Sequence, residues 1–123
     1  MSAVATRGEV MVIEDDFAIR ETLRELLEDQ GFHVTGAANG REALARLAEH
    51  APRLILLDLM MPVMDGIEFR SAQQRDERLA GIPVVVISAD HGLAQKASNM
   101  AVEGFLAKPF ELDELIETVQ RYC

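Results

Sequence analysis

The chain of 123 residues has no tryptophan and only one cysteine, Cys123, at its last position. With one cysteine no internal disulfide can form, so we expect a fold held by an apolar core in a reducing, cytoplasmic compartment. No apolar run approaches the ~20 residues that a membrane-spanning helix requires. Residues 1–8 lack the apolar segment of a secretory signal and are interpreted as a flexible leader, which leaves residues 9–123 as one domain.

Positive charge is scarce as well. The chain has 12 lysines and arginines against 21 aspartates and glutamates, for a formal net charge of −9. Nucleic-acid binding depends on neutralising backbone phosphates, and anionic membrane surfaces attract basic segments. We therefore expect neither direct nucleic-acid binding nor membrane association, and any contact with DNA would have to come from another domain or a partner.

The sequence does contain a regular alternation of apolar runs and helical patterns. Five short apolar runs are typical of strands, at residues 10–13, 32–37, 54–57, 83–87 and 104–107. Five stretches have apolar residues at helical spacing, at residues 19–27, 43–48, 65–75, 93–100 and 112–119. Gly31 is a predicted stop signal after the first helix, and Asn39 is a predicted N-cap of the second.

Strict alternation of strands and helices predicts an α/β fold, a doubly wound parallel sheet of five strands with five helices on its two faces. The flavodoxin-like strand order 2-1-3-4-5 is taken over from that fold class. The same class supplies the rule that ligands bind at the carboxyl ends of strands 1 and 3.

Polar side chains gather where the predicted strands end. Glu14 and Asp15 follow the first strand and Asp58 ends the third, while Ser88 ends the fourth and Lys108 follows the fifth. With the expected strand order, all of them meet at one edge of the sheet. Carboxylates a few ångströms apart repel one another, and a hard cation such as Mg²⁺, which prefers oxygen ligands, relieves that repulsion.

A carboxylate in such a site can act as a nucleophile and form an acyl phosphate. Phosphoryl transfer chiefly requires positioning and neutralisation of the phosphoryl oxygens. Mg²⁺ and Lys108 can neutralise them, and Ser88 can donate a hydrogen bond. The set lacks a general base aimed at a bound substrate and lacks an adenine or sugar pocket. It is therefore typical of a site that receives a phosphoryl group and holds it.

The chain resembles the receiver domains of bacterial two-component signal transduction. The matching stretches are residues 12–16 (VIEDD), 56–66 (LLDLMMPVMDG), 86–89 (VISA) and 104–110 (GFLAKPF). The second stretch and the Lys-Pro-Phe end of the last are specific as a set. The resemblance implies a phospho-accepting response regulator with Asp58 as the acceptor. Ala101 and Val102 stand where the family usually has a glycine that ends the fourth helix, so the length of that helix stays open.

The resemblance also implies a metal shell of carboxylates. Asp15 matches the direct ligand of Mg²⁺ or Mn²⁺, and Glu14 matches a ligand that acts through water. Asp58 and the backbone carbonyl of Met60 complete the shell.

A second group of residues matches the part of the family site that contacts the phosphoryl group. Ser88 matches the switch hydroxyl, with Ala89 beside it, and Lys108 matches the cation of the site. Phe105 matches the aromatic that turns inward together with the hydroxyl. The resemblance further implies a cis peptide bond before Pro109, which would fix the turn that aims Lys108.

The implied phosphoryl donor is a sensor histidine kinase or a histidine phosphotransfer protein. The domain would catalyse its own phosphorylation and dephosphorylation without turning over a separate substrate. The implied signalling surface consists of helix 4, strand 5 and helix 5. A downstream output protein, a second copy of the chain or a C-terminal output domain would respond at that surface.

Other interpretations of the same residues stay open. A hydrolase with an aspartyl-phosphate intermediate usually needs a second aspartate two residues after the nucleophile, where this chain has Met60. A flavin-binding module would need a phosphate loop after the first strand, where this chain has acidic residues that repel phosphate. Asp16 is interpreted as a solvated acidic residue at a helix start. The three histidines share no metal-ligand spacing and are interpreted as surface residues: His33, His50 and His91.

Overall fold

The structure is a computed structural model that describes residues 8–58, 66–88, 102–107 and 111–122. These residues form five strands and four helices. The strands are β1 Glu9–Ile13, β2 His33–Ala37, β3 Leu54–Asp58, β4 Val84–Ser88 and β5 Gly104–Ala107, and the helices are α1 Phe17–Asp29, α2 Gly40–Glu49, α3 Gly66–Arg75 and α5 Leu112–Tyr122. The helix predicted over residues 93–100 lies outside the described residues, so four of the five predicted helices are described.

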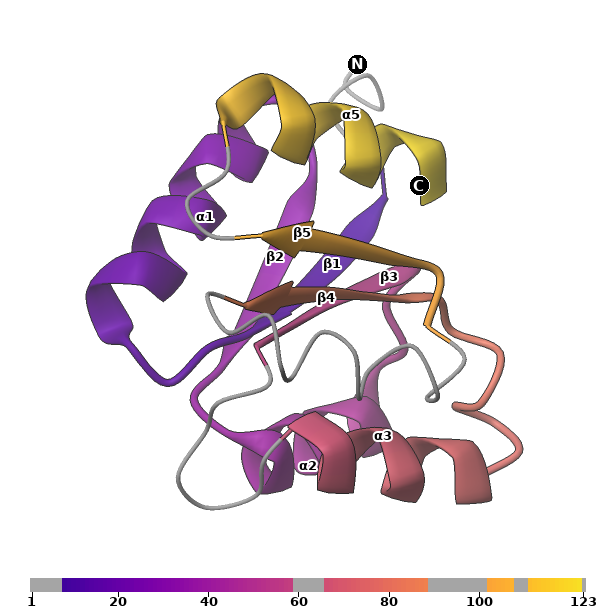
Figure 1. Ribbon diagram of the computed structural model, residues 1–123. Helices are drawn as coiled ribbons and strands as arrows, with labels where there is room; N and C mark the ends of the chain where they lie inside the picture. The colour runs from indigo at the N-terminus through magenta and orange to yellow at the C-terminus, as the bar shows by residue number, and fades with distance from the viewer. Residues whose placement is uncertain (1–7, 59–65, 89–101, 108–110, 123) are drawn as a thin grey trace.

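The strands form one parallel sheet in the order β2-β1-β3-β4-β5, as predicted for a flavodoxin-like fold. Helices α1 and α5 lie on one face of the sheet, and α2 and α3 lie on the other (Figure 1). A parallel sheet buries both faces, which explains why its central strands read as continuous apolar runs. Within the described ranges, no helix is long and apolar enough to cross a bilayer.

Successive side chains of the central strands β1, β3 and β4 enter two separate apolar layers. Along β3, Leu57 belongs to the cluster that contains Phe69 of α3, whereas Leu56 belongs to the cluster that contains Leu115 of α5. All of these side chains are fully buried. The sheet is thus clamped between two packed layers, and the ends of its strands are held in fixed positions.

The predicted start of α2 at Asn39 and end of α1 at Gly31 are confirmed, and Asp16 lies at a helix start as expected. Asp16 is the N-cap of α1, and its side chain accepts a hydrogen bond from Ile19 N at 3.1 Å. Asn39 is the N-cap of α2 and accepts from Glu42 N at 2.9 Å. Gly31 follows the last residues of α1 with a φ of 94°, a left-handed conformation that favours glycine.

One residue of the predicted apolar stripe of α1 departs from the expectation. Leu23 and Leu27 are buried, but Ile19 is 38% exposed and lines a shallow surface depression together with Thr22 and Leu26. Ile19 lies in the first turn of α1. The apolar layer that receives Leu23 and Leu27 does not extend that far along the helix.

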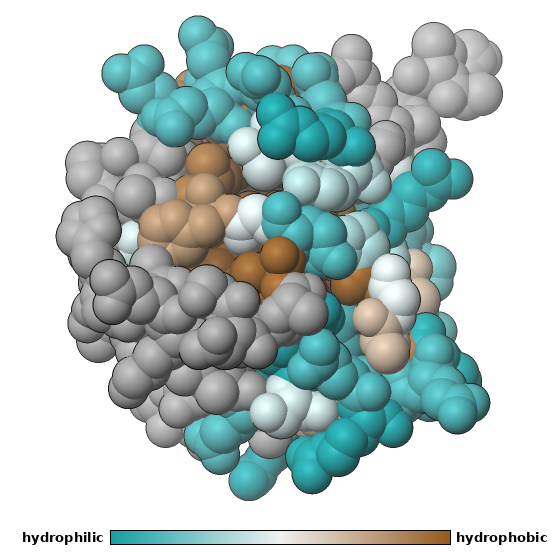
Figure 2. All heavy atoms as spheres, turned by 45° about the vertical axis from the view of Figure 1, so that its right-hand side comes forward, coloured by the Kyte–Doolittle hydropathy of each residue, from teal (hydrophilic) through white to brown (hydrophobic). Residues whose placement is uncertain are grey.

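The side of the molecule shown in Figure 2 has mostly polar residues at its top and bottom, with apolar atoms visible between them. Phe105 of β5 and Leu112 at the start of α5 are among the large apolar side chains that remain exposed, at 38% and 45%. The β5 edge of the sheet therefore carries apolar surface that the described part of the chain covers only in part.

A buried amide secures the connection from α3 to β4. Gln73 is fully buried, and its Nε2 donates to Leu79 O at 2.8 Å and to Ile82 O at 3.1 Å. Its Oε1 accepts from Arg70 Nη1 at 2.7 Å. Burial lowers the pKa of the Arg70 guanidinium, and the nearby carboxylate of Glu103 opposes that change. One amide group thus satisfies two loop carbonyls and one buried cation.

Replacement of Gln73 by leucine should destabilise the fold by roughly 2 kcal/mol, because the two carbonyls lose their donor and Arg70 loses an acceptor in a buried setting. Urea unfolding followed by circular dichroism measures the change. The matched control is Gln120→Leu on the exposed side of α5, which should alter the free energy of unfolding by less than about 0.5 kcal/mol. Equal effects of the two substitutions would show that the buried amide contributes nothing specific.

Candidate functional site

The carboxyl ends of β1 and β3 lie next to each other. The two strands pair in parallel, from Val10 beside Leu54 to Ile13 beside Leu57. The next residue of each chain segment is acidic, Glu14 after β1 and Asp58 at the end of β3. The register alone therefore brings two carboxylates to one point at the edge of the sheet.

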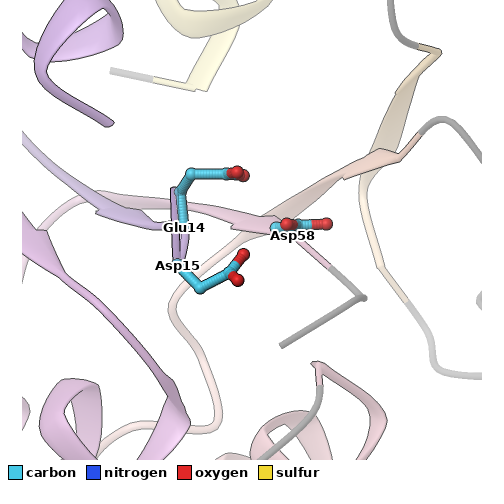
Figure 3. Close-up of side chains that lie close together, drawn as sticks. All are labelled: Glu14, Asp15 and Asp58. Atoms are coloured by element: carbon cyan, nitrogen blue, oxygen red, sulfur yellow. The ribbon is translucent and has the colours of Figure 1, made fainter. Parts of the chain in front are cut away.

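Asp15 adds a third carboxylate. Carboxylate oxygens of Glu14, Asp15 and Asp58 all lie within 4.8 Å of one another. Figure 3 shows the side chains of Glu14 and Asp15 extending from the end of β1 toward Asp58. Glu14 and Asp58 are buried, whereas Asp15 is exposed, so the cluster runs from the interior of the protein to solvent.

This donor set fits a hard divalent cation. Three carboxylates at such distances repel one another, and the repulsion is stronger where burial excludes water. Mg²⁺ takes oxygen ligands, uses only one or two carboxylates directly and keeps several waters. A cluster made only of oxygen donors and open to solvent on the Asp15 side meets those requirements, whereas a soft metal would prefer sulfur or imidazole ligands.

The turn between β1 and α1 is fixed by two hydrogen bonds to the backbone of Glu14. Glu14 N donates to Ala37 O at 3.0 Å, which extends the pairing of β1 with β2 by one residue. Arg20 Nη1 donates to Glu14 O at 2.7 Å. Asp16, the third acid of the sequence motif, caps α1 with its side chain and is absent from the carboxylate cluster. Its interpretation as an acidic residue at a helix start is confirmed, and the structure adds that its side chain caps the helix.

Ser88 lies on the other side of Asp58. Asp58 pairs with Ile87 of β4, so Ser88 is the next residue along that strand, and it is buried. Ser88 in turn pairs with Ala107 of β5. Phe105, two residues before Ala107, is partly exposed at the sheet edge. The described residues therefore bring the three predicted acids together and put Ser88 on the strand beside the predicted acceptor.

Four predicted site residues lie outside the described part of the chain: Met60, Ala89, Lys108 and Pro109. The predicted metal-shell carbonyl, the phosphoryl-contacting lysine and the cis peptide bond belong to this group, and they stay predictions.

Two features escaped the sequence analysis. One is the bond from the Arg20 side chain to the Glu14 carbonyl, for which the sequence contains no local signal. The other lies at the amino-terminal edge of the sheet, where the Glu9 carboxylate faces both His33 Nδ1, at 3.9 Å, and His50 Nε2. Glu9 and His33 are neighbours in the β1–β2 register, but no sequence pattern connects them with His50.

A family model described as the response regulator receiver domain matches residues 10–120 of the chain. The transcriptional regulatory protein CrdR of Helicobacter pylori is 36% identical over 115 residues, which cover 92% of this chain and 54% of CrdR. The chain thus spans about half the length of that regulator.

Solved structures have the same fold. The chemotaxis protein CheY4 of Vibrio cholerae superposes with a TM-score of 0.86 at 32% identity, covering 94% of this chain and 98% of CheY4. The receiver domain of the sensor histidine kinase PA1611 of Pseudomonas aeruginosa superposes with a TM-score of 0.87 at 26% identity, covering 94% and 96% of the two chains. That structure has a magnesium ion coordinated in its active-site cleft.

These matches extend over almost the entire chain and agree with the sheet order and with the acidic cluster at the ends of β1 and β3. The chain belongs to the response regulator receiver domain family, whose members accept a phosphoryl group and transmit a signal without turning over a separate substrate.

Proposed function

We propose that residues 9–123 form a receiver domain in which Asp58 accepts the phosphoryl group, with Mg²⁺ or Mn²⁺ held by Glu14, Asp15 and Asp58. The observation that carries this proposal is the group of three carboxylates within 4.8 Å of one another at the carboxyl ends of two adjacent central strands. Ligand sites of doubly wound sheets lie at this edge.

Asp58 is the best placed of the three carboxylates to be the acceptor. It ends the central strand β3, with Glu14 and Asp15 on the β1 side and Ser88 on the β4 side. A phosphoryl group on Asp58 would have the metal ligands on one flank and a hydroxyl donor on the other. On the outer side of Glu14 and Asp15 lies β2, which ends in Ala37 opposite Ile13, and its one hydroxyl residue, Thr35, pairs with Met11 earlier in β1.

The reaction exchanges one bond to phosphorus for another. An oxygen of the Asp58 carboxylate bonds to phosphorus while the phosphorus–nitrogen bond of the donor phosphohistidine breaks, and the electron pair of that bond stays on the imidazole. When bound, the metal neutralises charge on the phosphoryl oxygens. We assign the donor role to a sensor histidine kinase or a histidine phosphotransfer protein. Lys108, Ala89 and the carbonyl of Met60 complete the proposed site by resemblance.

The proposed signal is a change at the surface formed by the fourth helix, β5 and α5. Ser88 and Phe105 lie on the adjacent strands β4 and β5. A phosphoryl group that attracts the Ser88 hydroxyl would favour the state in which Phe105 turns inward from its partly exposed position. A downstream protein, a second copy of the chain or an output domain would detect the change.

The assignment of the acceptor predicts a specific covalent product. With Mg²⁺ and a small acyl phosphate such as acetyl phosphate, the protein should gain one phosphoryl mass, and Asp58→Asn should gain none. Intact-protein mass spectrometry measures the product. Asp16→Asn is the matched control, because it removes the same charge nearby and retains a good helix cap. Continued labelling of Asp58→Asn would assign the acceptor to another residue.

The carboxylate cluster predicts opposite effects of Asp15→Asn with and without metal. In a chelator, the variant should be more stable than the wild type, because one of three mutually repelling charges is removed. With Mg²⁺ at roughly 100 times its Kd, the wild type should gain ~2.7 kcal/mol and the variant far less. Thermal unfolding in the two buffers measures both effects. A full Mg²⁺ effect in the variant would exclude Asp15 as a ligand.

The proposed inward turn of Phe105 can be followed with a single fluorophore, because the chain has no tryptophan. In Phe105→Trp, acrylamide quenching of tryptophan emission should fall after phosphorylation, as the aromatic side chain becomes buried. The same substitution combined with Asp58→Asn should show no change. If mass spectrometry shows that the variant is phosphorylated but acrylamide quenching is unchanged, this aromatic side chain does not take part in the switch.

A further inference from the structure

We infer that Arg20 is a positioning residue of the acidic site, which holds the β1–α1 turn in the conformation that presents Glu14 and Asp15 to the metal. The inference rests on the proposed function, because it assumes that these carboxylates bind Mg²⁺. The observation that carries it is the hydrogen bond from Arg20 Nη1 to Glu14 O, at 2.7 Å and partly buried.

Three contacts hold Arg20 in place, one through its backbone and two through its side chain. Its backbone N–H bonds to Asp16 O at 2.9 Å within the first turn of α1. Its aliphatic stem packs against Gly36 of β2, where a Cβ atom would lie 3.1 Å from Arg20 Cδ. Its guanidinium carbon lies 5.4 Å from the centre of the Phe17 ring, within the range of a cation–π contact. A pre-positioned guanidinium loses less conformational entropy when it makes its hydrogen bond.

The bond from Arg20 fixes the peptide that links two of the proposed ligands. Glu14 N donates to Ala37 O, and Glu14 O accepts from Arg20, so both backbone groups of Glu14 are engaged. The carbonyl of Glu14 belongs to the same peptide plane as the amide of Asp15, and its orientation therefore sets the direction of the Asp15 backbone. The donor group meets a carbonyl and not a metal-binding carboxylate, so this hydrogen bond does not compete with the cation.

The direction in which Mg²⁺ affinity changes on removal of Arg20 distinguishes a positioning role from a purely electrostatic one. Removal of a positive charge close to an acidic site should strengthen the binding of a cation, if the charge acts only through its field. Loss of a group that orients the ligands should weaken binding, and outer-shell partners of metal sites typically contribute factors of ten or more. The two accounts thus predict changes of Mg²⁺ affinity in opposite directions.

The test is a Mg²⁺ titration of the full chain at constant ionic strength, followed by the amide resonances of the site in NMR, with no phosphoryl donor present. Arg20→Gln should weaken Mg²⁺ binding by about tenfold. Arg20→Lys, which keeps the charge but not the planar donor group, should also weaken it. Arg24→Gln is the matched control on the same helix, where surface ion pairs with Glu21 and Glu28 are lost, and its Kd should change by less than about twofold.

A second variant tests the inference without removing the arginine. Gly36→Ala keeps every charge but brings a methyl group against the Arg20 stem, so it should weaken Mg²⁺ binding in the same direction. If both Arg20→Gln and Gly36→Ala bind Mg²⁺ as tightly as the wild type or more tightly, the positioning role is wrong. If the wild-type protein shows no Mg²⁺ binding that depends on Asp15, the proposed function itself fails, which is a different outcome.

Discussion

The parallel pairing of β1 with β3 at the centre of the sheet is the constraint on which the site depends. Its register sets Ile13 beside Leu57, and the acids that follow meet at one edge. In a strand a shift by one residue moves every side chain to the opposite face. Such a shift would exchange the two apolar layers and separate Glu14 from Asp58. The same packing that buries Leu56 and Leu57 on opposite faces therefore also fixes the distance between the carboxylates.

The site has an energetic cost that the fold offsets. Two of its three acids are buried, and their mutual repulsion disfavours the folded state when no cation is bound. The rest of the sheet is continuous apolar packing between helices, with polar ends satisfied by caps such as Asp16 and Asn39. Natural proteins commonly contain unfavourable interactions at functional sites, and favourable interactions elsewhere in the fold compensate for them.

The sequence predicted most of the fold because its signals are local and repeated. Apolar runs, helical spacing and helix-start residues such as Asp16 and Asn39 are patterns among residues close together in the sequence. The structure confirms the five predicted strands and the four predicted helices that it describes. The strand order came from the fold class, since no local pattern in the sequence encodes it. The three acids were predicted because each one stands at a strand end, where topology alone brings such residues together.

The features that were missed depend on tertiary geometry. Ile19 is exposed because the apolar layer beneath α1 ends before it. The helical spacing of apolar residues predicts which face of α1 is apolar but not how far along the helix that face is covered. The contact of His50 with Glu9 joins the end of α2 to the start of β1, which are far apart in the sequence. Arg20 reads as an ordinary polar residue on a helix, and only the position of Gly36 on the neighbouring strand reveals why its stem lies where it does.

The contact between Arg20 and Phe17 affects how the surface of this domain should be interpreted. Phe17 is 67% exposed, and an exposed aromatic side chain of this kind is a candidate contact for a binding partner. Its ring already has a neighbour, because the guanidinium of Arg20 lies over it. An aliphatic side chain of similar size would retain the apolar surface area but would lack the negatively polarised ring face that attracts the guanidinium. The aromatic character of this exposed residue is thus accounted for within the molecule itself, with no need for a second molecule.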